Sequence, residues 1–283
     1  MQMTVSSERR VNLGCGGVRR ATWINFDADP AGKDVLMLDV RTGLPLGDRS
    51  VAVVYCSHLL EHLECEDASR LVGEAFRVLE PGGVFRVVVP DLEMIVRCYL
   101  EALEACLDAP SVNNVLNHSW MVTELVDQIA RDRSGGRMAT LLADPDLTNR
   151  DFVVGRVGEN ARSSALAETK SGWRRRLEAM GPLAWVSFAT RRLALRSFQA
   201  LVPSQLANDI EVGRFRRCGE VHRWLYDRFS LSALLRQQGF DRVVRQEHNT
   251  SIISDWMEDS LDTTEKGEAR KPDSLYMEGI RPA

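Results

Sequence analysis

Short apolar runs recur in the first third of the chain, and four of the five are followed by a glycine turn, an acid or a proline. They lie at residues 11–13, 23–26, 35–38, 51–56 and 84–89, and a helix-like stretch separates the last two. Strands that alternate with helices indicate a parallel sheet with crossover helices packed against it. The run at 51–56 is apolar throughout, as expected of a strand that is covered on both faces. We therefore expect an α/β fold.

The alternating pattern breaks after residue 91 and returns near the C-terminal end. A helix is predicted over 66–79 by its apolar stripe, and Pro81-Gly82-Gly83 follows it. Residues 92–217 then show amphipathic helices and loops without strand-like alternation. A helix at 231–238 and strands at 240–244 and 274–280 complete the pattern. The prediction is one α/β domain formed by 1–91 and 218–283, interrupted by a helical cap at 92–217.

Polar residues that suit a nucleoside ligand follow three successive predicted strands. Gly14 and Gly16 come after the first strand, where glycine lets a ligand approach the backbone closely. Asp27 ends the second strand and can accept both ribose hydroxyls, whereas Asp39 ends the third and can accept a hydrogen bond from an exocyclic amine. Ligands of parallel sheets bind beyond the carboxyl ends of the strands, so this is an adenosine-binding pattern.

These segments resemble the class I S-adenosylmethionine (SAM) methyltransferases. The resemblance rests on VNLGCGG, WINFDADP, VLMLDV, and above all on HLLEHL followed by RVLEPGG, and covers about residues 10–92. It implies a Rossmann-like seven-stranded, mostly parallel sheet of order 3-2-1-4-5-7-6. The helical region at 92–217 would then be a large insertion between strand 5 and the helix that follows it. SAM is the implied cofactor.

The resemblance also implies a role for each residue of the cofactor site. Gly14 and Gly16 would hold the methionine part of SAM, and Asp27 would hold the ribose. The adenine would contact Asp39 and the amide of Val40, and the sulfonium would lie near Ser57 and His58. Two departures stand out: the connection at 14–22 is too short for a full crossover helix, and Ala52 replaces the usual aspartate. Other groups, the insert among them, are therefore expected to hold part of the methionine tail.

These residues also allow other interpretations. Gly14 and Gly16 could form only a tight turn, and Asp29 is a rival to Asp27. A dinucleotide site is disfavoured because the acid comes too soon after the glycines, and no P-loop motif exists. The net charge of −4 gives no reason to expect nucleic-acid binding. No metal site is predicted, since CxxC pairs are missing and Asp91 is the only further acid at a strand end.

Two histidines are the predicted catalytic residues. His58 directly follows the fourth strand and is the first choice for a general base, because histidine titrates near neutrality. The alternative is that His58 only hydrogen-bonds the backbone or the cofactor. His222 lies in GEVHRWLYD beside Tyr226 and Asp227, where the chain re-enters the sheet on the expected substrate side. It could equally belong to a core motif that anchors the insert.

A basic, aromatic-rich stretch lies inside the insert. Residues 161–200 contain eight basic and two acidic residues, a surplus of 8 − 2 = 6, interleaved with Trp, Phe and Leu. Such a segment can lie on an anionic membrane, and the alternative is an amphipathic lid helix. No apolar stretch is long enough to span a bilayer. We expect a cytoplasmic protein with peripheral contact at the inner membrane face.

The expected function is O-methylation of a polar, sugar-containing small molecule or glycan. The sugar preference comes from the resemblance alone, because similar sequences look like enzymes of polysaccharide or glycolipid assembly. One alternative is a SAM-binding interaction protein that transfers no methyl group. Another is an enzyme that transfers the aminocarboxypropyl chain of SAM. The oligomeric state does not follow from the sequence.

Overall fold

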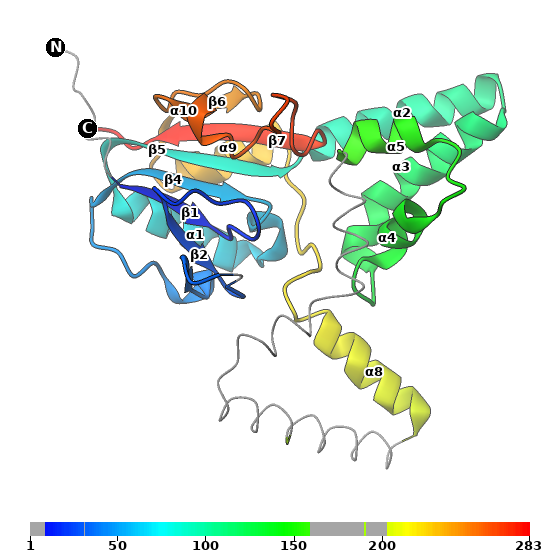
Figure 1. The fold of residues 1–283 in the computed structure, drawn as a ribbon, viewed down its shortest axis with the longest axis horizontal. Coiled ribbons are helices and arrows are strands. Elements are labelled where there is room, and N and C mark those ends of the chain that lie inside the picture. Colours follow the sequence, from blue (N-terminus) through cyan, green and yellow to red (C-terminus); the bar gives the residue numbers. More distant parts are fainter. Residues whose placement is uncertain (1–8, 31, 159–189, 191–202) are drawn as a thin grey trace. The chain divides into compact units, whose positions relative to one another are not determined.

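The fold is built on one seven-stranded sheet, which we describe from a computed structural model of residues 9–30, 32–158, 190 and 203–283 (Figure 1). The strands stand in the order β3-β2-β1-β4-β5-β7-β6. Their bounds are β1 Arg10–Leu13, β2 Ile24–Asp27, β3 Val35–Met37, β4 Val51–Ser57, β5 Leu79–Pro90, β6 Asp241–Gln246 and β7 Ser274–Ile280. The first five strands pair in parallel, and β7 pairs antiparallel with β5 and β6. The predicted Rossmann-like sheet and its strand order are confirmed.

Two helices cover one face of the sheet. The first, α1 (Cys65–Val78), buries the stripe that its sequence period predicts, including Leu71, Val72 and Ala75. The second, α9 (Arg228–Gln237), begins at a capping box in which Asp227 accepts from the Ser230 amide and the Ser230 hydroxyl accepts from the Asp227 amide. Both pack on the apolar side chains of β1, β4 and β5 in one core cluster.

The opposite face lacks a crossover helix between β1 and β2. Residues 14–23 form only turns, which confirms the prediction drawn from the short spacing. The long segment between β6 and β7, residues 247–273, covers this face instead and contains the one-turn helix α10 (Trp256–Asp259) (Figure 1). Its Trp256 packs against Tyr55 of β4 and against Trp23, with ring centroids 5.3 and 6.1 Å away.

Arg86 of β5 ties this covering segment to the sheet. Its side chain is fully buried and donates to Asp262 and Glu278, both at 2.7 Å. It also donates to the backbone carbonyls of residues 247 and 250, each at 2.9 Å. The guanidinium lies 4.5 Å from the ring centroid of Trp256. A buried cation is tolerated when its charge and its donors are matched in this way.

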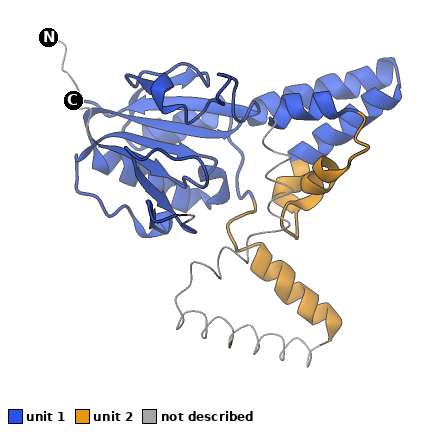
Figure 2. Cartoon of the chain, viewed as in Figure 1, with its two compact units in different colours: residues 1–125, 149–158, 222–283 blue, residues 126–148, 159–221 orange. Residues whose placement is uncertain are grey.

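The insertion between β5 and α9 is helical, as predicted. Its described helices are α2 Leu92–Asp108, α3 Val112–Ala130, α4 Gly136–Ala143, α5 Arg150–Val157 and α8 Ser204–Phe215. The chain divides into two compact units, 1–125 with 149–158 and 222–283, and 126–148 with 159–221 (Figure 2). The first unit therefore includes α2 and α5 besides the sheet. None of the described helices has the length and apolarity needed to cross a bilayer.

We expect Arg86→Met to lower the free energy of unfolding by about 3–5 kcal/mol, because Asp262 and Glu278 would stay buried without their cation. Urea denaturation of the folded variant measures the loss. The matched control is Arg70→Met, which removes an exposed pair with Asp67 and should cost less than about 1 kcal/mol. Equal losses in the two variants would contradict the role given to Arg86.

Candidate functional site

A cavity of about 280 Å³ lies at the carboxyl ends of β1 and β4. Its walls come from three parts of the first unit: the turn after β1, the end of β4, and the segment between β6 and β7. The lining includes Gly14, Gly16, Ser57, His58, Asp262 and Lys271. A cavity therefore lies at the sheet edge that was predicted to bind the cofactor, and four of the predicted site residues line this cavity.

The turn after β1 leaves backbone exposed to the cavity. Gly14 and Gly16 have φ of +65° and +50°, a conformation that favours glycine. A Cβ at Gly16 would meet no atom within 4 Å, so open space lies beside this residue. A Cβ at Gly14 would instead press on Leu59 at 3.2 Å. Gly16 thus offers the close backbone approach that a ligand requires, whereas Gly14 is also needed for packing.

Asp27 stands beside this turn at the end of β2. One carboxylate oxygen accepts from the Gly16 amide and the other from the Asp29 amide, both at 2.8 Å. Asp27 is half-buried, and the lining of the cavity does not include it. Its carboxylate fixes the glycine turn. A carboxylate oxygen has a second lone pair, so either oxygen can also accept a hydroxyl from a ligand at the rim.

Asp39 and Val40 lie farther along the same sheet edge, outside the lining of the cavity. Asp39 is exposed and caps the short 3-10 helix η1 (Val40–Thr42) by accepting from the Arg41 amide. The Arg41 guanidinium also binds this carboxylate and holds its pKa below the usual value. Val40 is half-buried. The predicted adenine contacts therefore stay a prediction.

His58 lines the cavity in a strained backbone conformation. Its φ is +50°, which is uncommon for a residue with a side chain and is typical of functional sites. Its Nε2 lies 2.9 Å from the Ser274 hydroxyl, and its Nδ1 lies 3.2 Å from a carboxylate oxygen of Glu61. Burial, helped by the nearby Lys271 ammonium, lowers the pKa of His58 to about 4. The imidazole is therefore neutral at pH 7, with one nitrogen able to accept a proton.

Lys271 lines the cavity, although it was not predicted from the sequence. It comes from the segment between β6 and β7 and is half-buried, and burial lowers the pKa of its ammonium. In the part of the chain that the structure describes, this ammonium forms no hydrogen bond and no ion pair. Arg270 beside it donates instead to the carbonyls of residues 260, 261 and 263. Lys271 is therefore a cation that is available to an anionic ligand.

Known proteins match the N-terminal part of the chain, which contributes the glycine turn and the end of β4 to the cavity. Residues 11–87 match the family of the methyltransferase domain. A segment of 58 residues is 48% identical to a protein of Mycolicibacterium smegmatis described as a "Probable S-adenosylmethionine-dependent methyltransferase". That segment is 19% of this chain and 22% of the relative, so the chain matches about a fifth of that protein's length.

Solved structures of SAM-dependent methyltransferases are among the similar folds. One from Archaeoglobus fulgidus is 12% identical, with 98% of this chain and 87% of that chain covered and a TM-score of 0.40. One from Mesorhizobium loti is 25% identical, with 29% and 47% covered and a TM-score of 0.26.

Residues 11–87 therefore carry the similarity to the methyltransferase domain family. The relative is described as dependent on SAM. The matched residues include the glycine turn, Asp27, Asp39, Ser57 and His58, whereas Lys271 lies beyond them.

His222 lies outside the lining of the cavity. It is buried beside His62 and Glu61, which belong to the 3-10 helix η2 (Leu60–His62) behind His58. Its predicted catalytic role stays a prediction. The basic stretch at 161–200 falls almost wholly outside the described residues.

A buried acid lies two residues after Lys271, just before β7. Asp273 is buried, and this burial together with the nearby Glu124 carboxylate raises its pKa to about 6. Glu124 of α3 is itself paired with Arg156 of α5 at 2.5 Å. The raised pKa means that ionising Asp273 costs more in the folded protein than in the unfolded chain.

We expect Asp273→Asn to stabilise the protein at pH 7.5 but not at pH 4. The folded pKa of about 6 exceeds the unfolded value of 3.8, so the stability that this group contributes is present below pH 3.8 and is lost as the pH rises through 6. The gain at pH 7.5 should be about 2–3 kcal/mol, at 1.36 kcal/mol per pKa unit.

Urea denaturation at both pH values measures this difference, with Asp108→Asn, an exposed aspartate at the end of α2, as the control. A difference between Asp273→Asn and wild type that does not change with pH would show that Asp273 is not the titrating group.

Proposed function

We propose that this protein is a SAM-dependent methyltransferase that binds SAM in the cavity at the ends of β1 and β4. The observation that carries the proposal is the meeting of the glycine turn with an unpaired lysine ammonium across that cavity. SAM carries a carboxylate at its methionine end and hydroxyls on its ribose. The lining offers a cation for the first, and Asp27 at the rim offers an acceptor for the second.

The short connection at 14–23 leaves the methionine tail without the support of a crossover helix. Lys271 stands in the segment that covers the sheet in the place of that helix, and it lines the cavity together with Gly16. We assign Lys271 to the methionine carboxylate, because a charged hydrogen bond in a half-buried site is strong. The Gly14–Gly16 turn would pack against the tail, and Ser57 and His58 would lie near the sulfonium. Asp39 and the Val40 amide remain the proposed adenine contacts.

His58 is the proposed general base. SAM, when bound, supplies the methyl group, and the protein must orient the acceptor and remove its proton. Glu61 faces Nδ1 of His58, which favours the tautomer whose free nitrogen is Nε2. In the structure Nε2 faces the Ser274 hydroxyl, and an acceptor hydroxyl could take the place of that group. His222 is the second predicted catalytic residue, and it is buried behind this histidine, outside the lining of the cavity.

The proposed acceptor is a polar, sugar-containing small molecule or glycan. Its support from the structure is a set of three polar groups in the lining, since Ser57, Asp262 and the His58 imidazole offer hydrogen bonds to hydroxyl groups. We further propose that residues 92–217 cap the acceptor side, and that the basic stretch at 161–200 contacts an anionic membrane surface at its cytoplasmic face.

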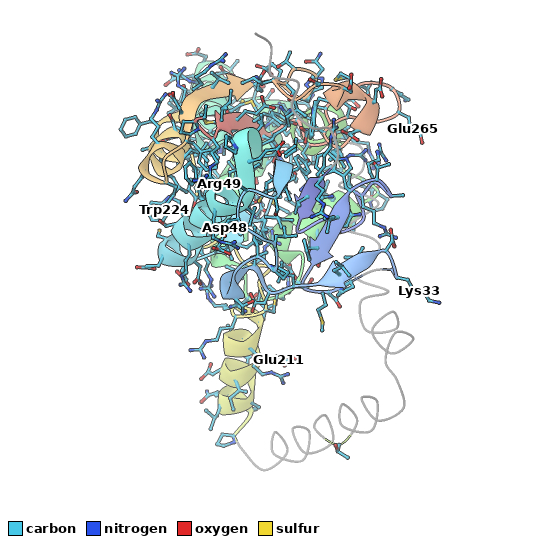
Figure 3. All side chains as sticks on the ribbon, turned by 90° about the vertical axis from the view of Figure 1, so that its left-hand side faces the viewer. Lys33, Asp48, Arg49, Glu211, Trp224 and Glu265 are labelled. Atoms are coloured by element: carbon cyan, nitrogen blue, oxygen red, sulfur yellow. The ribbon has the colours of Figure 1, made fainter. Side chains whose placement is uncertain are left out.

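Lys271→Met should weaken SAM binding by about 10-fold to 100-fold, since a hydrogen bond to a charged group contributes about 1.5–3 kcal/mol. Calorimetry with SAM and with S-adenosylhomocysteine measures the change. The control is Lys266→Met in the same segment, an exposed lysine whose neighbour Glu265 projects from the surface (Figure 3). If both variants bind SAM as wild type does, Lys271 does not hold the cofactor.

Methyl transfer itself is tested with SAM radiolabelled at the methyl or at the carboxyl carbon, offered with a panel of hydroxylated sugars and glycans. We expect label from the methyl carbon only. His58→Gln should lower the rate by about 10²–10⁴-fold without weakening SAM binding. Label from the carboxyl carbon would indicate aminocarboxypropyl transfer instead. No transfer of either label to any acceptor, with SAM bound tightly, would favour a SAM-binding interaction protein.

A further inference from the structure

Three side chains with metal-binding atoms meet behind the cavity wall. Glu61, His62 and His222 each place one such atom within 4.8 Å of the other two. The imidazole rings of His62 and His222 are 4.7 Å apart at nearly right angles. Glu61 and His62 are neighbours in η2, whereas His222 is 160 positions further along the chain. This grouping is a product of the fold, and spacing along the sequence does not show it.

Backbone hydrogen bonds fix the approach of His222. The amides of Arg223 and Trp224 both donate to the carbonyl of Glu61, at 2.6 and 3.2 Å. The Trp224 side chain projects into solvent (Figure 3), and His222 on the other side is buried at 4% exposure. The segment entering the sheet is thereby held against η2, with its histidine directed inward.

Among the described residues, the carboxylate of Glu61 forms no ion pair with a lysine or an arginine. Its side chain is fully buried, and one of its oxygens lies 3.2 Å from Nδ1 of His58. No other described residue gives either oxygen a hydrogen bond, and Nδ1 of His62 is buried without one as well. A buried carboxylate with a single neutral donor beside it is costly unless a cation binds it.

We propose that Glu61, His62 and His222 bind a divalent transition-metal ion, with Zn²⁺ as the best match. Two imidazoles and one carboxylate are a donor set that zinc takes in proteins, with water as the fourth ligand. Tetrahedral zinc places its donors about 3.4 Å apart, so each donor atom would shift inward by about 1 Å. One carboxylate and two neutral imidazoles leave a net charge of +1 around the ion.

The contact between Glu61 and His58 would connect the metal site to the cavity. One carboxylate oxygen of Glu61 can bind the metal while the carboxylate still faces Nδ1 of His58. A carboxylate that binds a metal and also a histidine fixes the orientation of that histidine. The metal would thus be a positioning element for His58 and would give His222 the role of a ligand instead of a catalytic residue. The proposal does not depend on SAM binding or on methyl transfer.

The first test uses the full-length protein after treatment with a chelator. We expect it to take up one Zn²⁺ per chain by calorimetry, and Zn²⁺ to raise its unfolding temperature. Titration with Co²⁺ should give the intense visible absorption bands of a tetrahedral site. Neither readout requires activity, and SAM affinity is measured separately by calorimetry.

Variants locate the ion. His62→Gln and His222→Gln should each weaken Zn²⁺ binding by at least about 100-fold, because each removes a direct ligand. His248→Gln, in the segment after β6, is the matched control and should bind like wild type. His62 is only half-buried, so this variant serves if His222→Gln does not fold.

Two results would overturn the proposal. Wild-type protein that takes up no Zn²⁺ and gives no tetrahedral Co²⁺ spectrum would show that Glu61 is balanced by its histidine neighbours alone. Zinc binding that survives both His62→Gln and His222→Gln would place the ion elsewhere in the chain.

Discussion

The short connection between β1 and β2 is the constraint on which the rest of the molecule depends. Residues 14–23 cannot form a crossover helix, so one face of the sheet needs another cover. The segment between β6 and β7 provides it, and Arg86 fastens that segment from inside the sheet through Asp262 and Glu278. The same segment carries Lys271 to the carboxyl ends of β1 and β4. Residues 247–273 thus cover the face of the sheet that the short connection at 14–23 leaves without a helix.

The sheet and part of the site could be predicted from the sequence. Apolar runs such as 51–56 mark buried strands. Residues that directly follow a strand, such as Gly14 and His58, reach the sheet edge whatever the course of the loops. Lys271 was not found, because its segment has no strand or helix period and its course depends on Arg86. The proximity of Glu61 and His222 could not be predicted either. The two residues lie far apart in the sequence, and backbone hydrogen bonds from residues 223 and 224 hold them together. The compact units do not follow the predicted insertion, since α2 and α5 group with the sheet, and the predicted bounds at 92–217 stay a prediction.

His58 connects the cavity to the buried polar cluster behind it. One of its nitrogens faces the buried Ser274 hydroxyl and the other faces Glu61. Its left-handed backbone conformation is held by a hydrogen bond from its amide to the Val88 carbonyl at 2.8 Å. Packing and pairing therefore fix both the backbone and the ring of this residue. Such pre-organisation suits a group that must meet a reacting atom without rearrangement.

The central claim is that the cavity at the ends of β1 and β4 binds SAM. A crystal structure with S-adenosylhomocysteine tests it most directly. We expect electron density for the ligand in this cavity, with its carboxylate within hydrogen-bond distance of the Lys271 ammonium and its ribose beside Asp27. Density at another place, or a cavity that stays filled by water at saturating ligand, would contradict it.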